Sequence, residues 1–246
     1  MTRIFSYYKP HNGLEKQEKI IELWKLSWRL SGFDAILLGE EDAKKHPFYD
    51  TFLEKIKKYH KIVMNGKVLS EHSLTCYMRW LAYATQKDSN FFVSDYDVMS
   101  TGFDSIELDN SIHLLDDCCP CFAFGSPKLF ENLCKGFLEQ TEKRLDFMLE
   151  NKYYNHFPNY NDLSFFVFNC TKKWNKDYDS FMKEYKIKKS RKLNIESKLI
   201  TNEQKVLHIS KPYVSEYKDY KVNHTISEDE KIEVIEEVLE KYFKNY

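Results

Sequence analysis

The stretch FFVSDYDV, from Phe91 to Val98, says more about the fold than any other part of the chain. An apolar run typical of a buried strand stops at Asp95 and Asp97, two carboxylates separated by one residue. In α/β proteins, ligands bind beyond the carboxyl ends of such strands. Neighbouring carboxylates repel each other unless a cation lies between them, and Mg²⁺ or Mn²⁺ is the usual partner. The stretch therefore predicts a cation site, although a polar turn after a strand has the same sequence.

On both sides of this strand, apolar runs alternate with segments of helical periodicity, which predicts an α/β fold. We expect strands at 3–8, 34–38, 62–64, 90–94, 111–115, 121–125 and 205–209, and helices at 14–31, 40–59 with a break near Pro47, 70–85, 127–151 and 161–169. A capping box at 227–230 predicts a final helix, and the Lys-rich segment 181–198 is expected to be a solvated connection. The alternation favours a mostly parallel sheet flanked by helices, with right-handed crossovers. No repeat or linker divides the chain, so we expect a single domain.

Composition narrows the class of protein. The 246 residues include 37 basic and 38 acidic side chains, and this balance argues against a nucleic-acid binder that relies on a broad basic field. No apolar run approaches the ~18 residues of a membrane-spanning helix, and the first residues resemble a strand rather than a signal peptide. The six cysteines lack zinc-site spacing, which favours reduced thiols in a cytoplasmic protein.

His208 and Lys211 lie near the end of the last predicted strand. An imidazole is a suitable third ligand for Mn²⁺ beside two carboxylates, and a Lys can hold a phosphate as a point charge. The alternatives are a hydrogen-bonded core histidine and an ordinary surface lysine.

Arg79 lies in an otherwise apolar helix just before the DxD strand. A guanidinium there needs an anion, either a ligand in the site or a nearby acid in a salt bridge. Asp162 begins another predicted helix. It is either the N-cap of that helix or a carboxylate that acts as base or orients an acceptor.

Taken in order, these motifs resemble the GT-A-fold glycosyltransferases, which use nucleotide sugars and carry a DxD motif. The motifs are IFSYY at 4–8, the Arg79-bearing helix, FFVSDYD at 91–97, Asn161-Asp162, and His208 with Lys211-Pro212-Tyr213. The ending is similar to the His…Lys-Pro-Trp ending of the glycogenin-like retaining transferases. The arrangement of Arg79, helix and DxD is similar to the DxD sugar-binding family of mannosyl- and galactosyltransferases. Small domains of this kind also occur in large DNA viruses, which would place the chain in the host cytoplasm.

The resemblance implies a Rossmann-like GT-A domain over 1–246, with a nucleotide-binding half at 1–100, an acceptor and metal half at 101–215 and a C-terminal helical extension at 216–246. It also implies a metal-dependent hexosyl- or deoxyhexosyltransferase. The donor is a nucleoside-diphosphate sugar, with UDP favoured, and the acceptor is a glycan or glycoprotein, with retention slightly favoured.

The roles that the resemblance implies are carried over by position. Asp95 contacts the ribose and, with the metal, the donor, while Asp97 and His208 ligate Mn²⁺ or Mg²⁺. Lys211 holds the diphosphate, and Arg79 holds the donor sugar or phosphate. Ser6 and Tyr8 line the base, and Ser94 and Tyr96 flank Asp95 on the substrate-binding surface. If Asp162 is a general base, the reaction inverts.

Two other functions are compatible with the DxD stretch. A haloacid-dehalogenase-type phosphatase uses Asp-x-Asp after a strand as nucleophile and acid, which here would be Asp95 and Asp97. Its motif normally lies near the start of the chain, whereas two strand–helix units precede this one. A non-catalytic nucleotide-sugar-binding module is the other alternative. Hydrolysis of a phosphoester without a nucleotide would favour the phosphatase, and nucleotide binding without turnover would favour the module.

Overall fold

The computed structural model describes residues 1–10, 15–104, 106–116, 119–157, 159–189, 205–210, 214–215, 217–218 and 226–243. Within these residues, six strands form the main sheet, in the order β2 (Phe33–Leu38), β1 (Thr2–Tyr7), β3 (Phe91–Ser94), β6 (Cys119–Gly125), β5 (Ile112–Asp116) and β7 (Ile187–Lys189). The pairs β1–β2, β1–β3 and β5–β7 are parallel, whereas β3–β6 and β5–β6 are antiparallel. The sheet is therefore mixed, and β3, which leads into the DxD stretch, is parallel to β1 on one side and antiparallel to β6 on the other.

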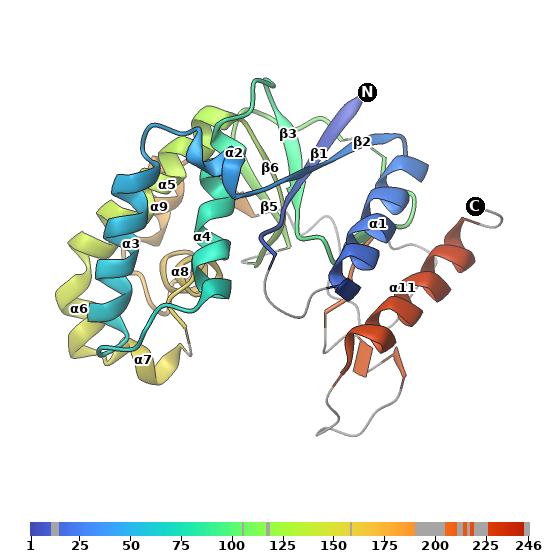
Figure 1. Cartoon of the computed structure of the whole chain (residues 1–246). Coiled ribbons are helices and arrows are strands. Elements are labelled where there is room, and N and C mark those ends of the chain that lie inside the picture. Colours follow the sequence, from blue (N-terminus) through green and yellow to red (C-terminus); the bar gives the residue numbers. More distant parts are fainter. Residues whose placement is uncertain are drawn as a thin grey trace.

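Helices cover both faces of the sheet (Figure 1). On one side lie α1 (Glu15–Leu30) and α11 (Glu228–Tyr242), which pack against each other. The other side carries α2 (Glu40–Lys44), α3 (Tyr49–Val63), α4 (Glu71–Ala84), α5 (Pro127–Lys143), α6 (Leu145–Glu150), α7 (Tyr153–His156), α8 (Asp162–Asn169) and α9 (Tyr178–Glu184).

Successive side chains of a strand point to opposite faces of the sheet, so each strand contributes to a core on both faces. In β3, Phe92 packs into the core under α1 and α11, whereas Phe91 and Val93 pack into the core on the opposite face. Because both faces are covered, every residue of this central strand is buried, and its first three are apolar with no polar residue between them.

The order of β2, β1 and β3 determines where a ligand can bind. The chain passes from β1 to β2 on one side and then returns across β1 to form β3 on its other side. The carboxyl ends of β1 and β3 are thus adjacent at a point where the strand order reverses. In α/β sheets such a switch point opens a crevice at those ends.

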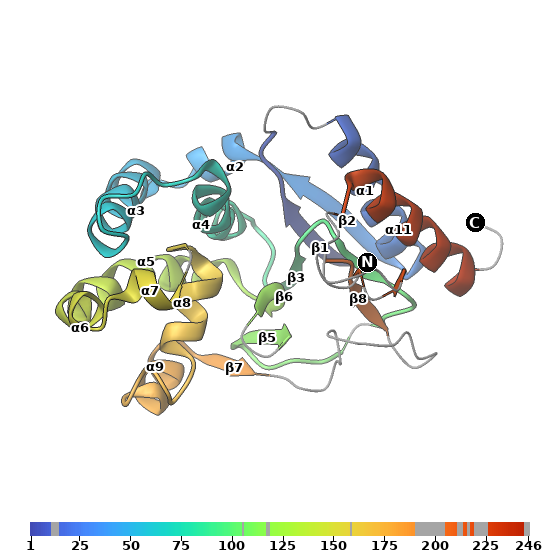
Figure 2. The ribbon, with the colours of Figure 1, turned by 90° about the horizontal axis from the view of Figure 1, so that it is seen from below.

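A small second sheet joins distant parts of the chain. The strand β4 (Val98–Ser100) follows the DxD stretch directly and pairs antiparallel with β8 (Val206–His208), with Val98 opposite His208. Figure 2 shows β8 on the same side of the main sheet as α1 and α11. The backbone N–H of Ile209 also donates to the carbonyl oxygen of Asp97, at 2.8 Å. Two segments more than a hundred residues apart in sequence are therefore held together beside Asp97.

Most predicted elements are confirmed, including the break near Pro47, the strand before the DxD and the capping box at Ser227. The strand predicted at 62–64 is wrong, because Ile62 and Val63 complete the last turn of α3, where Val63 continues the buried face. The predicted helix 127–151 is divided at Arg144 into α5 and α6. The solvated connection expected at 181–198 is wrong up to residue 189, where the chain forms the end of α9 and then β7. Residues 190–198 lie outside the described part of the chain.

Candidate functional site

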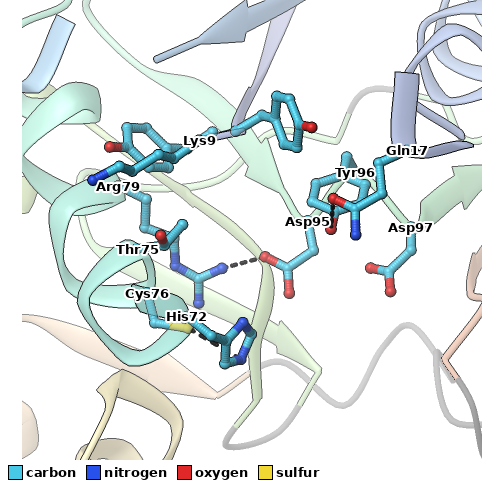
Figure 3. Close-up of a pocket in the computed structure, with 11 residues that line it drawn as sticks. Lys9, Gln17, His72, Thr75, Cys76, Arg79, Asp95, Tyr96 and Asp97 are labelled. Atoms are coloured by element: carbon cyan, nitrogen blue, oxygen red, sulfur yellow. Dashed lines mark hydrogen bonds and ion pairs between the residues drawn. The ribbon is translucent and has the colours of Figure 1, made fainter. Parts of the chain in front are cut away.

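A pocket of about 180 Å³ opens at the carboxyl ends of β1 and β3 (Figure 3). It is lined by Tyr7, Tyr8 and Lys9 from the end of β1, Gln17 from α1, His72, Thr75, Cys76 and Arg79 from α4, and Asp95, Tyr96 and Asp97 after β3. The α4 residues follow helical spacing and so share one face of that helix. The pocket therefore lies at the switch point of the sheet and holds more than a single ion or water.

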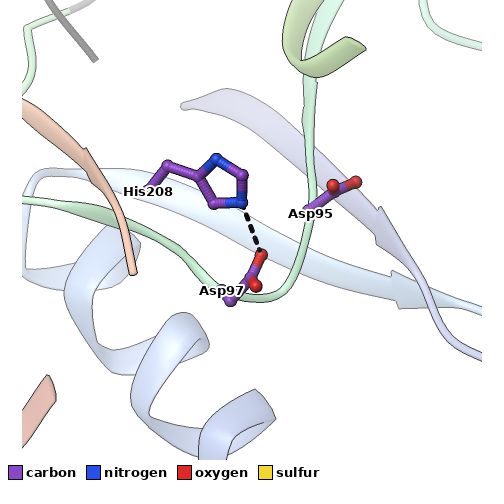
Figure 4. Close-up of side chains that lie close together, drawn as sticks. All are labelled: Asp95, Asp97 and His208. Atoms are coloured by element: carbon purple, nitrogen blue, oxygen red, sulfur yellow. Dashed lines mark ion pairs between the residues drawn. The ribbon is translucent and has the colours of Figure 1, made fainter. Parts of the chain in front are cut away.

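Asp95, Asp97 and His208 come together as the sequence predicted, with the two carboxylates in the lining of this pocket and His208 beside Asp97. Each offers one ligand atom, and these atoms lie within 4.8 Å of one another (Figure 4). Two carboxylate oxygens and one imidazole nitrogen suit Mn²⁺ or Mg²⁺, and the nitrogen favours Mn²⁺. Ligand distances of about 2.1 Å place opposite ligands of one octahedral cation about 4 Å apart, so the group fits such an ion with small side-chain adjustments.

The carboxylate of Asp97 interacts with two cationic or potentially cationic groups. Its Oδ1 lies 3.5 Å from Nε2 of His208, and its Oδ2 accepts a hydrogen bond from Nζ of Lys231 in α11, at 2.7 Å. Burial acts to raise the pKa of Asp97, but Lys231 and His208 outweigh it, and the pKa lies below its ordinary value. Asp97 is therefore ionised at neutral pH, as a cation ligand requires.

Arg79 joins the DxD to α8. Its Nη1 forms an ion pair with Oδ1 of Asp95, and its Nε and Nη2 donate to Oδ2 of Asp162 at 2.8 and 2.5 Å. Burial raises the pKa of Asp95, Arg79 opposes this, and the Asp97 carboxylate adds to it, so that the pKa is raised. The salt bridge expected as one alternative for Arg79 is present, and the guanidinium also lines the pocket. Its role toward a donor stays a prediction.

Asp162 is not the N-cap of α8, so that alternative is wrong. The N-cap is Asn161, whose side chain accepts from the backbone N–H of Ser164 at 2.9 Å, and Asp162 is the first helical residue. Its side chain is 1 % exposed, and Oδ2 accepts from Nε1 of Trp80 at 2.9 Å as well as from Arg79. In this arrangement Asp162 fixes the orientation of the Arg79 guanidinium. A role as base toward an acceptor stays a prediction.

The other predicted substrate-binding residues divide into two groups. Tyr8 and Tyr96 line the pocket, with ring centroids 5.7 Å apart in an edge-to-face arrangement, and the Tyr96 hydroxyl donates to Oε1 of Gln17 at 3.2 Å. Ser6 and Ser94 are buried outside the lining, where Ser94 Oγ accepts from Nε1 of Trp24 at 2.9 Å. Lys211 lies outside the described residues.

Several residues at the site were not predicted, although the sequence positions of some of them indicate that they lie there. Lys9 is the second residue after β1, and its Nζ lies 3.4 Å from carboxylate oxygens of both Glu40 and Glu71. His72 and Cys76 precede Arg79 at helical spacing, which placed them on its face. Lys231 gave no such signal, because 134 positions separate it from Asp97 and only the packing of α11 brings the two together.

Comparisons of the chain with protein-family models, curated proteins and solved structures gave no match. No helix among the described residues has both the length and the apolar character needed to cross a membrane. A functional assignment therefore depends on the chemistry of this pocket.

Proposed function

We propose that the chain is a metal-dependent glycosyltransferase that moves a sugar from a nucleoside-diphosphate sugar to a hydroxyl acceptor. The observation that carries the proposal is the Asp95–Asp97–His208 group at a pocket on the switch point of the sheet. A switch-point crevice suits a nucleotide, and a divalent cation beside it suits a diphosphate.

The rest of the pocket supplies groups for the organic part of such a donor. Tyr8 and Tyr96 offer aromatic surface to a base, and Gln17 offers an amide to a polar edge. Arg79 and Lys9 bring cationic side chains to the lining, each of them paired with two carboxylates. A uridine diphosphate sugar is the donor class we propose, and the acceptor is a glycan or glycoprotein.

In this mechanism Asp95, Asp97 and His208 would hold a Mn²⁺ or Mg²⁺ ion, which would supply a Lewis acid to the diphosphate leaving group. The Arg79 guanidinium lies next to Asp95, where it would stabilise negative charge. The side chains that line the pocket would orient the donor. We favour retention, because the buried Asp162 carboxylate is already bonded to Arg79 and Trp80.

The pairing of Asp95 with Arg79 favours the transferase over the phosphatase. A phosphatase of the dehalogenase type needs the first Asp of the pair as a free nucleophile. In this chain, one oxygen of that carboxylate bonds to a guanidinium.

Metal removal tests the proposal. We expect UDP to bind in the presence of Mn²⁺ and to lose affinity by about tenfold or more in excess chelator, because the ion compensates charge between the carboxylates and the diphosphate. With Mn²⁺, UDP at 100 times its dissociation constant raises the free energy of unfolding by about 2.7 kcal/mol. Isothermal titration calorimetry and thermal melting measure these quantities.

Uridine without phosphates is the matched control, and its weaker binding should not depend on Mn²⁺. Equal UDP affinity with and without chelator would remove the metal from the proposal. Release of phosphate from a simple phosphoester in the absence of nucleotide would replace the transferase with the phosphatase.

A further inference from the structure

Lys231 is a lysine in an unusual place. It lies one turn into α11, its side chain is 11 % exposed, and its Nζ bonds to Oδ2 of Asp97 at 2.7 Å. Lys side chains are almost never buried unless they are paired. Burying this ammonium beside a candidate metal ligand therefore calls for an explanation.

The attachment of α11 to the fold does not supply one. The helix packs its apolar face, which includes Val234, Ile235, Val238 and Leu239, into the core shared with α1. On the surface, Lys16 pairs with Asp229 at 2.5 Å and Lys19 pairs with Glu236 at 3.3 Å, which joins the two helices. A capping box at Ser227 starts the helix. These interactions attach α11 to the fold independently of the bond between Lys231 and Asp97.

The position of Lys231 divides the Asp97 carboxylate between two partners. Oδ2 bonds to the ammonium, whereas Oδ1 faces His208 at 3.5 Å. An ion held by Asp95, Asp97 and His208 would therefore share the Asp97 carboxylate with the ammonium. Like charges that share one carboxylate repel each other strongly where the surroundings are partly buried.

A charge count leads to the same point. Among the described residues, the connected group contains three carboxylates, Asp95, Asp97 and Asp162, and two fixed cations, Arg79 and Lys231. These five groups together leave one net negative charge for a divalent ion. One negative charge does not balance the two positive charges of the ion. A diphosphate that enters with the ion brings the further negative charge that is needed.

We propose that Lys231 is an internal counter-cation that keeps the affinity of the site for free Mn²⁺ low, so that the ion is retained only together with a diphosphate. The inference rests on the metal site of the proposed function. It makes ion and diphosphate binding mutually dependent, because each supplies the charge that the other lacks.

The test compares Lys231→Met with the wild-type chain by titrating Mn²⁺ in the absence of nucleotide and following the electron paramagnetic resonance signal of the free ion. We expect the variant to bind free Mn²⁺ about tenfold or more tightly than the wild type. UDP should strengthen Mn²⁺ binding to the wild type, and this enhancement should shrink in the variant. Lys241→Met removes an equal charge from an exposed position about 15 Å along the same helix and should behave as the wild type.

Unchanged or weaker Mn²⁺ binding by Lys231→Met would overturn the inference and leave Lys231 as a support for Asp97. Lys231→Gln retains a hydrogen-bond donor but removes the charge. It should also bind Mn²⁺ more tightly, and it replaces the Met variant if that variant does not fold. The Mn²⁺ measurement needs no nucleotide. Failure of UDP to bind would therefore count against the glycosyltransferase proposal, whereas equal Mn²⁺ affinity would count against the role of Lys231.

Discussion

Replacing Asp97 with Asn is expected to weaken Mn²⁺-dependent UDP binding by more than about 100-fold, since loss of a residue that merely orients a metal ligand already costs about 10- to 100-fold. The amide keeps the shape of the side chain but not the charge that attracts a hard cation. The same change leaves the Lys231 ammonium buried without its carboxylate. We therefore also expect the free energy of unfolding to fall by about 1–3 kcal/mol.

Urea denaturation and calorimetric titration of UDP with Mn²⁺ separate the two effects. The double variant Asp97→Asn/Lys231→Met should recover most of the stability, because neither charge is left buried alone, but it should not recover UDP binding. Asp109→Asn is a matched control. Its exposed carboxylate pairs with Lys188 and His113, and its loss should leave UDP binding unchanged. UDP affinity retained in Asp97→Asn would show that Asp97 is not a ligand.

Replacing Arg79 with Met is expected to lower the free energy of unfolding by about 3–5 kcal/mol, the cost of breaking a buried ion pair by removing one partner. The substitution keeps the length of the side chain but leaves the Asp162 carboxylate, which is 1 % exposed, without its guanidinium. Asp95 loses its cation as well. Urea denaturation at neutral pH measures the loss.

Two further variants test the cause of that loss. Arg79→Met combined with Asp162→Asn should be clearly more stable than Arg79→Met alone, because the uncompensated charge is removed. Arg79→Lys keeps the charge but lacks the planar fork that bonds to Asp95 and Asp162 at once, so it should fold and bind UDP with Mn²⁺ less tightly than the wild type. If Arg79→Met were as stable as the wild type, the pairing with Asp162 would not contribute to the fold.

The parts of the molecule that the sequence predicts well are those with local physical causes. Apolar runs predict the strands on both sides of α1, and the Ser227–Glu230 capping box predicts the start of α11 within one residue. Asp95, Asp97 and His208 were predicted to share a site and lie within reach of one ion. Carboxylates and an imidazole are typical ligands of a divalent cation, and this chemistry can be recognised however far apart the residues lie in the sequence.

The errors occur where local pattern and tertiary packing differ. Ile62 to Met64 are apolar enough for a short strand, but Ile62 and Val63 complete α3, with Val63 on its buried face, and Met64 is the C-cap of that helix. Asp162 begins a helix, and its neighbour Asn161 takes the capping role, which leaves Asp162 free to bond to Arg79. Lys231 resembles the other lysines of the chain, and only its burial beside Asp97 distinguishes it.

The pairing of β4 with β8 has a consequence for the order in which a ribosome delivers the chain. Every strand of the main sheet that the structure describes lies between Thr2 and Lys189, and the DxD lies within that span. His208 and Lys231 emerge later, on β8 and α11. The residues that line the pocket therefore leave the ribosome before His208 and Lys231 do. If the proposed cation site exists, it can be completed only after β8 and α11 have been synthesised.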